Sequence, residues 1–222
     1  MTLNPIYTKM RIFKNRQDAG KQLSELLSHY KDKNVIVYAL PRGGVDVAAE
    51  IAKFLHAPLD LLFAHKICHP YQLEYAIGAV SENGYIIGEE LKLFDSKWLE
   101  AAKKHEIQEM KRKRDLYLKG RKSLDAKEKI AILVDDGIAT GRTMEVGIME
   151  LRAHNPEKIV MAVPVAPRST FDALAEIADE AAAIEVPKDE NFLGAVGAYY
   201  REFNQVEDEE VIAILANHKW PS

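Results

Sequence analysis

The stretch from Ile130 to Met144 constrains the fold of this chain more than any other. It reads Ile-Ala-Ile-Leu-Val-Asp-Asp-Gly-Ile-Ala-Thr-Gly-Arg-Thr-Met, so an apolar run leads directly into two adjacent carboxylates, Asp135 and Asp136. A continuous apolar run is typical of a strand buried on both faces, hence of a central strand in a parallel sheet. We therefore expect a strand, a short loop and a helix from about residue 143. Open parallel sheets bind ligands at the edge where such loops lie.

The loop after this strand has the composition of an anion-binding loop. Gly137 and Gly141 let the backbone approach a phosphate closely and adopt a positive φ where needed. Backbone N–H groups at the start of the next helix, together with the helix dipole, favour an anion there. Asp135 and Asp136 suit other partners, namely two neighbouring hydroxyls, as on a ribose, or a divalent cation. The plainer alternative is that these acids only cap the helix.

The segment from Val134 to Thr143 resembles, position by position, the phosphoribosylpyrophosphate (PRPP) binding motif of the type I phosphoribosyltransferases. That motif is an apolar strand, two acids, two variable residues, a small residue, Thr or Ser, Gly, any residue, then Thr or Ser. The segment lacks the Gly-Lys-Ser/Thr of a P-loop and the G-x-G-x-x-G of a dinucleotide site. The resemblance implies an α/β fold, with an open, mainly parallel, Rossmann-like sheet and helices on both faces.

The resemblance also implies roles for the motif residues. Asp135 and Asp136 would hold the ribose 2′- and 3′-hydroxyls and contact Mg²⁺ through its water shell. Arg142 fills the variable position, so we expect its side chain to point to solvent. The residues that would hold the 5′-phosphate of PRPP are Ala139, Thr140, Gly141, Arg142 and Thr143.

Composition places further limits on the kind of protein. The 222 residues suit a single domain spanning 1–222, and 30 basic against 34 acidic residues give a net charge of −4. This balance does not favour nucleic acid or a membrane as a partner. Cys68 is the only cysteine, which excludes an intrachain disulfide and a zinc site built on several cysteines. The sequence shows no signal-peptide pattern and no apolar run near the ~20 residues of a membrane helix, so we expect a cytoplasmic protein.

A second strand–loop–helix unit is predicted nearer the N-terminus. Residues 15–30 read as an amphipathic helix capped by Asn15, and residues 34–40 as a buried strand. A helix over 45–55 follows the intervening glycine loop. An arginine in such a loop supplies a guanidinium suited to phosphate. The resemblance implies that this loop holds pyrophosphate, often around a non-proline cis peptide bond, through Pro41, Arg42, Gly43 and Gly44.

Residues 59–64 are predicted as a third strand, and the sequence after them permits a hairpin within 76–87. In the family that the motif resembles, this segment is a mobile flap that closes over the reacting centre. Lys66 and Glu74 are our catalytic candidates from the flap, as the residues that would bring charge to the substrate.

Two histidines and the lone cysteine lie close together in the flap segment. His65, Cys68 and His69 are too few and too closely spaced for a convincing metal site. His69 is an alternative to Lys66 as the proton donor of the flap, on residue type alone.

Residues 95–122 are charge-dense, and Lys111-Arg-Lys-Arg114 is their most basic run. One interpretation is an arm that binds nucleic acid. The alternative, which the neighbouring acids favour, is a helical insertion that is largely solvated and has a narrow apolar stripe. A stripe containing Trp98 would suit a subunit contact, and we expect a homo-oligomer, in the simplest case a dimer.

Regular elements continue beyond the motif, with helices predicted over 142–154, 168–179 and 207–216 and strands over 158–163 and 181–186. The resemblance implies a hood over the acceptor base, for which the glycine- and aromatic-rich stretch 187–206 is the local candidate. Aromatic faces stack on planar bases. The candidate base-binding residues are Phe192, Tyr199, Tyr200 and Phe203.

Two points limit this assignment of the hood. Tyr199 and Tyr200 are adjacent, so in an extended chain they point to opposite sides and only one should meet a ligand. The alternative is that these aromatics pack against the edge of the sheet.

These features predict a phosphoribosyltransferase that uses PRPP, Mg²⁺ and a nitrogenous base that the sequence does not identify. The first alternative is a non-catalytic regulator that senses PRPP and binds nucleic acid or protein. The second is a PRPP-making enzyme similar to a pyrophosphokinase, although no separate ATP-binding motif is present in the sequence.

Overall fold

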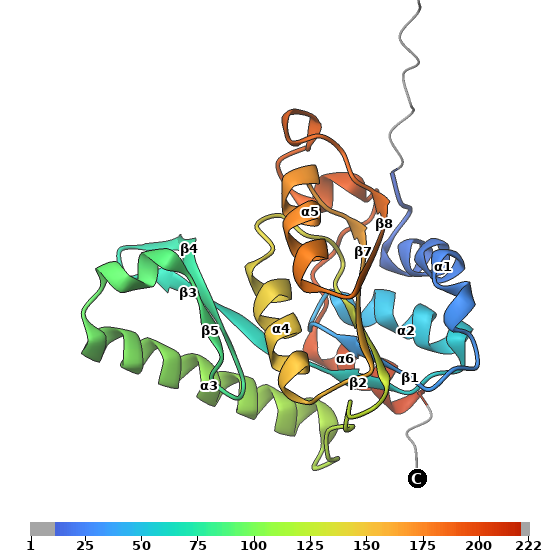
Figure 1. The fold of residues 1–222 in the computed structure, drawn as a ribbon, viewed down its shortest axis with the longest axis horizontal. Coiled ribbons are helices and arrows are strands. Elements are labelled where there is room, and N and C mark those ends of the chain that lie inside the picture. Colours follow the sequence, from blue (N-terminus) through green and yellow to red (C-terminus); the bar gives the residue numbers. More distant parts are fainter. Residues whose placement is uncertain (1–11, 219–222) are drawn as a thin grey trace, which may run out of the picture.

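A five-stranded parallel sheet forms the centre of the molecule (Figure 1). The computed structural model describes residues 12–218, except for the side chains of Leu73 and Glu74. Neighbouring strands all run parallel, which confirms the predicted α/β fold class. In spatial order the strands are β2(Leu59–Leu61), β1(Val35–Ala39), β6(Ile130–Val134), β7(Lys158–Val165) and β8(Glu180–Glu185).

The two strands that carry the glycine loops, β1 and β6, are direct neighbours. Val35 lies opposite Ile130, and Ala39 lies opposite Val134. Every residue of both strands is buried, as expected for continuous apolar runs in a parallel sheet. Because the register is in step, both strands end at the same level, and their following loops leave the sheet side by side.

Helices cover both faces of this sheet. α1(Arg16–Leu26), α2(Gly44–Leu55) and α6(Asp208–Ala216) pack on one face, and α4(Arg142–Ala153) and α5(Arg168–Ile177) pack on the other (Figure 1). Alternate residues of each central strand point to opposite faces. The strands therefore contribute to two separate apolar cores, one beneath each layer of helices.

The first helix begins where the sequence predicts. The Asn15 side chain accepts a hydrogen bond from the Asp18 N–H at 3.0 Å, which caps α1. The helix ends at Leu26 and is followed by a short 3₁₀ turn, η1(Ser28–Tyr30), so the predicted helix over 15–30 is divided into two pieces.

A second, antiparallel sheet follows β2. The strand predicted over 59–64 is wrong in its second half, because the chain leaves the main sheet after Leu61. It then enters β3(Ala64–His69), which pairs with β4(Gln72–Ser81), and β4 pairs with β5(Ile86–Ile87). Residues 59–63 are buried throughout, so the apolar pattern does not reveal the change of sheet. The hairpin expected within 76–87 is present.

The small sheet, the turn η2(Glu89–Leu93) and the helix α3(Ser96–Leu118) form a unit that projects from the main sheet, and we call residues 64–118 the arm (Figure 1). The Asp95 side chain caps α3 by accepting two backbone N–H groups, at 2.9 and 3.1 Å. Met110 and Tyr117 are buried, and Trp98 packs against the same core. The apolar stripe of the predicted helix thus packs against the core formed with the small sheet and α2.

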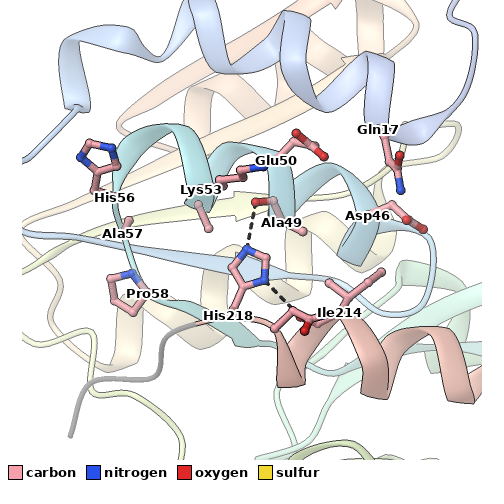
Figure 2. A pocket seen from close by; sticks show the side chains of 12 residues that line it. Gln17, Asp46, Ala49, Glu50, Lys53, His56, Ala57, Pro58, Ile214 and His218 are labelled. Atoms are coloured by element: carbon pink, nitrogen blue, oxygen red, sulfur yellow. Dashed lines mark hydrogen bonds between the residues drawn. The ribbon is translucent and has the colours of Figure 1, made fainter.

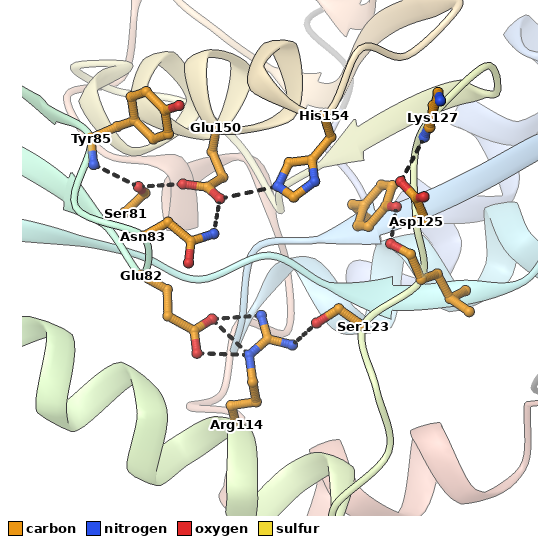
Figure 3. Close-up of polar contacts among 12 residues, drawn as sticks. Ser81, Glu82, Asn83, Tyr85, Arg114, Ser123, Asp125, Lys127, Glu150 and His154 are labelled. Atoms are coloured by element: carbon orange, nitrogen blue, oxygen red, sulfur yellow. Dashed lines mark hydrogen bonds and ion pairs between the residues drawn. The ribbon is translucent and has the colours of Figure 1, made fainter.

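A polar cluster ties the base of the arm to α4 (Figure 3). Glu150 of α4 is only 5% exposed, and its carboxylate accepts hydrogen bonds from the side chains of Ser81, at 2.5 Å, and Asn83. Arg114 of α3 donates from Nε to the Glu82 carboxylate at 2.6 Å. Helix α4 begins at the central motif, so this cluster links the arm to the helix that follows the acid pair.

Two further 3₁₀ turns, η3(Asp189–Asn191) and η4(Val196–Tyr199), lie between β8 and α6. Helix α6 starts with a capping box formed by Glu207 and Glu210. Within residues 12–218, none of the helices combines the length and the apolar character needed to cross a membrane.

Candidate active site

Asp135 and Asp136 lie at the carboxyl end of β6, in the middle of the sheet edge. The Asp136 N–H donates to Oδ1 of Asp135 at 2.8 Å. The hydroxyl of Tyr200 donates to the main-chain oxygen of Asp136 at 2.6 Å. The Asp136 side chain is 15% exposed. The acid pair therefore sits on a fixed backbone and has little contact with solvent.

The two glycine loops meet at this pair, as the sequence predicts. A Cβ added to Gly43 would overlap Oδ2 of Asp136, and one added to Gly44 would lie 2.8 Å from the main-chain oxygen of Val134. Gly43 has a φ of −58°, so close packing and not backbone conformation requires glycine there. The Pro41–Arg42 peptide bond is cis, which is the feature implied for this loop by the resemblance.

The electrostatics of the pair combine burial, mutual repulsion and two nearby cations. Burial raises the pKa of the Asp135 carboxyl well above its usual value, and the neighbouring Asp136 raises it further. Burial also raises the pKa of Asp136, although Arg16 opposes the shift through its charge and a hydrogen bond. The charge of Lys66, which is exposed on β3, also opposes the shift by lowering the pKa of Asp135. The predicted flap lysine is therefore close enough for its charge to reach the pair.

Arg16 is a site residue that the sequence analysis missed. Its Nε donates to Oδ2 of Asp136 at 2.7 Å, and its Nη1 donates to the main-chain oxygen of Asn204 at 2.7 Å. These partners lie 120 and 188 positions along the chain, so no local motif indicates them. The available local signal is a cation at the start of a helix, where the helix dipole disfavours positive charge.

The loop between β6 and α4 presents its backbone at the surface. Ala139 and Thr140 are exposed. Gly141 caps α4 with a φ of 75°, and a Cβ there would lie 2.8 Å from the Thr170 side chain. The Thr170 hydroxyl donates to the main-chain oxygen of Ala139 at 3.2 Å. Helix α5 thus supports the loop from behind, next to the N-terminus of α4.

The expectation that Arg142 points to solvent is wrong. Its Nη2 lies 3.8 Å from Oε1 of Glu90 in the arm, and its side chain is 29% exposed. Glu90 also accepts a hydrogen bond from the Tyr75 hydroxyl at 2.8 Å. The start of α4 is therefore in contact with the arm, because the arm folds back over this end of the helix.

Arg42 does not point toward the acid pair in this structure. Its Nη1 lies 3.5 Å from the Asp208 carboxylate and 3.6 Å from that of Glu207, both at the start of α6. The Tyr117 hydroxyl of α3 donates to the same oxygen of Asp208 at 2.6 Å. The guanidinium is thus paired with acids that follow the predicted hood, and within the loop it is Gly43 that adjoins Asp136.

His65 and His69 contact residues of the arm and not the acid pair, and the side chain of Glu74 is not among the described residues. Nδ1 of His65 lies 2.9 Å from Glu106 of α3, and burial lowers the pKa of this histidine. The ring of His69 packs among aromatic side chains of the arm. No group of three or more His, Cys, Asp or Glu in the described residues could hold a metal ion. The side chain of Glu74 lies outside those residues, so its role stays a prediction.

The aromatics of the predicted hood pack against one another. Tyr199 is fully buried and Tyr200 is 7% exposed. Phe192 stacks on Tyr199 with ring centroids 5.5 Å apart, and Tyr200 lies between Phe13, at 5.3 Å, and Phe203, at 4.9 Å. Neither tyrosine is placed to stack on a ligand, because both rings are buried in these contacts. Tyr199 ends the 3₁₀ turn η4, while Tyr200 is extended. For Tyr199, Tyr200 and Phe192 the packing corresponds to the alternative, in which aromatics fill the edge of the sheet. Phe203 is 36% exposed, so its role in base binding stays a prediction.

The basic run in α3 is partly neutralised. Arg112 pairs with Glu109 at 3.0 Å, and Arg114 turns inward to Glu82 at 2.6 Å. These pairs fit the interpretation of α3 as a solvated helix better than the alternative of a nucleic-acid arm.

A cavity of about 840 Å³ lies beside α2, between α1 and the end of α6 (Figure 2). His218 faces it, with its two ring nitrogens 3.0 and 3.1 Å from the main-chain oxygens of Ala49 and Ile214. Its lining includes none of the loop residues 41–44 or 135–143. This cavity is therefore separate from the acid pair.

The sheet, the paired glycine loops and the acids at the end of β6 define the class of this protein. The model of the phosphoribosyl transferase domain family matches residues 6–201. The chain belongs to this family, as the motif around Asp135 and Asp136 indicated.

Comparisons with individual proteins agree with this assignment. Two proteins of Mycobacterium tuberculosis (strains CDC 1551 / Oshkosh and H37Rv), each named "Putative phosphoribosyl transferase", are 39% identical to the chain over 210 residues. The match covers 93% of the chain but 47% of each relative, so the chain spans about half their length. The crystal structure of TT1426 from Thermus thermophilus is 36% identical, with a TM-score of 0.78 over 93% of this chain and 98% of that one. AQ2163 from Aquifex aeolicus, 14% identical with a TM-score of 0.50 over 81% of this chain and 78% of that one, shares the fold alone.

Proposed function

We propose that the protein transfers a ribose 5-phosphate group between PRPP and a nitrogenous base. The observation that carries this proposal is the meeting of two glycine loops at a buried acid pair, where Gly43 packs directly on Asp136. Such a site offers carboxylate acceptors flanked by two backbone surfaces suited to anions. PRPP has the matching pattern of charge, because its ribose hydroxyls lie between a phosphate and a pyrophosphate.

Each part of the site has a role in this proposal. Asp135 and Asp136 hold the ribose 2′- and 3′-hydroxyls. The backbone of residues 139–143 at the start of α4, where Ala139 and Thr140 are exposed, holds the 5′-phosphate. The backbone of residues 41–44 holds the pyrophosphate. The Arg42 side chain can reach the pyrophosphate only by leaving Asp208 and Glu207, so the backbone makes the main contact.

The donor set fits Mg²⁺ when the substrate supplies most of the ligands. Mg²⁺ usually keeps several waters and binds one or two carboxylates together with substrate phosphates. Asp135 and Asp136 would contact it through water, which agrees with the finding that no group of three or more His, Cys, Asp or Glu among the described residues could hold a metal ion by itself. The ion would neutralise charge on the leaving pyrophosphate.

The contribution of the chain to catalysis is positioning and electrostatics. A nitrogen of the base replaces pyrophosphate at C1 of the ribose, where positive charge develops as the bond to pyrophosphate breaks. The acid pair fixes the ribose, and the two loops fix the pyrophosphate on C1 and the phosphate on C5. Lys66 and Glu74 are the residues that we propose the arm brings to the substrate, while closure of the arm excludes water.

The test is a panel of free purine and pyrimidine bases, each incubated with the protein, PRPP and Mg²⁺, with release of pyrophosphate as the readout. We expect at least one base to release pyrophosphate and to yield the corresponding nucleotide. If PRPP binds but no base reacts, the protein is a PRPP sensor and not a transferase. Formation of PRPP from ATP and ribose 5-phosphate would instead identify a pyrophosphokinase.

A further inference from the structure

Arg16 is held on three sides by residues from distant parts of the chain. Its Nε donates to Asp136 and its Nη1 to the main-chain oxygen of Asn204, both at 2.7 Å. The guanidinium carbon lies 3.8 Å from the centre of the Phe203 ring, a distance at which the ring attracts a cation. The side chain is 12% exposed. An arginine fixed by a carboxylate, a carbonyl and an aromatic face has little freedom to move.

The position of Arg16 also bears on the pyrophosphate loop. A Cβ at Gly43 would lie 3.2 Å from Nε of Arg16 as well as overlapping the Asp136 carboxylate. The arginine, the acid and the loop therefore pack as one unit. A cation at the first residue of α1 works against the helix dipole, so its contribution to the helix itself does not account for its presence.

Asp136 has a particular need for such a partner. It lies beside a second buried carboxylate, Asp135, and the Asp46 carboxyl is near enough for the charge of Asp136 to raise its pKa. Tyr200 holds the main-chain oxygen of Asp136, not its side chain. Among the described residues, Arg16 supplies the side-chain donor found on the Asp136 carboxylate. A carboxylate has about four acceptor positions, so this bond leaves room for a hydroxyl donor.

We infer that Arg16 is a positioning residue, which orients the Asp136 carboxylate to accept a ribose hydroxyl and joins segment 200–204 to the acid pair. This inference rests on the proposed function, in which Asp136 binds the ribose. Arg16 acts through Asp136, so its effect on PRPP affinity should disappear when Asp136 can no longer bind the ribose as a carboxylate.

A double-mutant cycle tests this dependence. PRPP is titrated with Mg²⁺ into the wild-type protein, Arg16→Gln, Asp136→Asn and the double variant, with the free energy of unfolding measured for each. Arg16→Lys keeps the charge and loses the forked hydrogen bonds. Arg152→Gln is the matched control, because Arg152 also donates to a carboxylate, Asp179 at 2.8 Å, and to a main-chain oxygen at 3.0 Å, but at the far end of α4.

We expect Arg16→Gln to weaken PRPP binding on the order of tenfold, since a hydrogen bond to a charged group is lost. The double variant should bind no more than about twofold more weakly than Asp136→Asn alone. Arg16→Lys should lie between wild type and Arg16→Gln, and Arg152→Gln should bind PRPP as wild type does. If Arg16→Gln does not fold, the cycle is measured with Arg16→Lys in its place.

Three results would overturn the inference. The first is unchanged PRPP affinity in folded Arg16→Gln. The second is a double variant whose loss equals the product of the two single losses, which would make Arg16 an independent structural residue. The third is a wild-type protein that does not bind PRPP, which removes the proposed function as well and is distinguished from the first two by the wild-type titration alone.

Discussion

Two groups of buried or largely buried carboxylates in this molecule have different surroundings. At the base of the arm, Glu150 accepts hydrogen bonds from two side chains, and Glu82 accepts them from an arginine. Asp60, the middle residue of β2, is fully buried and accepts backbone N–H groups at 2.6 and 2.7 Å. At the end of β6, the Asp135 carboxylate accepts a hydrogen bond from the Asp136 N–H, and the Asp136 carboxylate accepts one from Arg16 Nε. Figure 3 shows the donors that contact Glu150 and Glu82.

This difference separates a structural role from a binding role. A buried carboxylate is costly unless donors satisfy it. The three acids at the base of the arm (Glu150, Glu82 and Asp60), which we call the arm acids, meet that condition with donors from the chain itself, so their burial is explained by the fold. The acid pair has fewer donors and keeps acceptor capacity, which a ligand with hydroxyls would use. The two groups should therefore respond oppositely to substitution: loss of stability for the arm acids, loss of binding for the pair.

The largest expected effect is on binding by the pair. Asp135→Asn combined with Asp136→Asn removes charge-assisted hydrogen bonds worth roughly 1.5–3 kcal/mol each, so PRPP affinity should fall by well over tenfold. The free energy of unfolding should hold or rise, because repulsion between two buried like charges is relieved. Isothermal titration and urea unfolding measure the two quantities. Unchanged affinity in a folded double variant would contradict the ribose-binding role.

Among the acids at the base of the arm, Glu150 in α4 should give the reverse result when it is replaced by Ala. The substitution leaves the buried Ser81 hydroxyl and the amide of the exposed residue Asn83 without their acceptor, at a cost of about 1–3 kcal/mol in the free energy of unfolding. Urea unfolding measures this loss, and Glu157→Ala, at an exposed position after α4, serves as the control. PRPP affinity should stay near that of wild type. A large loss of affinity without loss of stability would break the distinction between the two groups.

The pH dependence of stability sharpens the comparison at Asp60. Burial raises the pKa of Asp60 from 3.8 to about 6. The folded protein thus binds this proton more tightly than the unfolded chain, so the stability that Asp60 contributes is complete below about pH 4 and is lost as the pH rises through about 6. Relative to Asp60→Asn, which does not titrate, the wild-type free energy of unfolding should fall by up to about 3 kcal/mol over this window. If the free energy of unfolding has the same pH dependence in wild type and in Asp60→Asn, Asp60 does not titrate as described.

A smaller effect is expected for Gly43→Ala. The added Cβ would overlap Asp136 Oδ2, so the loop must shift, at a cost of about 1–2 kcal/mol in PRPP binding. Gly120→Asn is the control, because nothing lies within 4 Å of a Cβ there and Asn tolerates its positive φ. Titration with PRPP compares the two variants. Equal affinities would mean that the contact between the pyrophosphate loop and Asp136 has no part in binding.

The smallest effect is expected for Arg142→Ala. Its contact with Glu90 is long, at 3.8 Å, and both side chains are partly exposed, and such pairs contribute about 0–1 kcal/mol. PRPP affinity should therefore change by less than about threefold in the same titration. A severe loss would show that the Arg142 side chain, and not the loop backbone, holds the 5′-phosphate.

Local pattern was enough to predict the main sheet and the acid pair. β6 occupies residues 130–134 as expected, because a strand buried on both faces is encoded by its own apolar run. The motif residues from Asp135 to Thr143 are contiguous, so their proximity is guaranteed by chain connectivity. The adjacency of the 41–44 loop followed from topology, since parallel neighbours end at one edge.

Contacts between distant segments could not be predicted in the same way. The partners of Arg16 lie more than one hundred positions away, and the turn that buries Tyr199 and Tyr200 depends on packing against Phe13 and the sheet edge. The departure of the chain from the main sheet after Leu61 is hidden because the apolar run continues through Phe63 into the second sheet. Each of these features is set by tertiary packing, which local sequence pattern does not reveal.

The most direct test of the account is isothermal titration of the wild-type protein with PRPP in the presence of Mg²⁺, repeated after removal of the metal with a chelator. The account predicts saturable binding at one site per chain, weakened when Mg²⁺ is removed, because the ion offsets the charge of pyrophosphate beside the acid pair. Absence of saturable binding to a folded protein in the presence of Mg²⁺ would contradict the assignment of Asp135 and Asp136 as a ribose-binding pair.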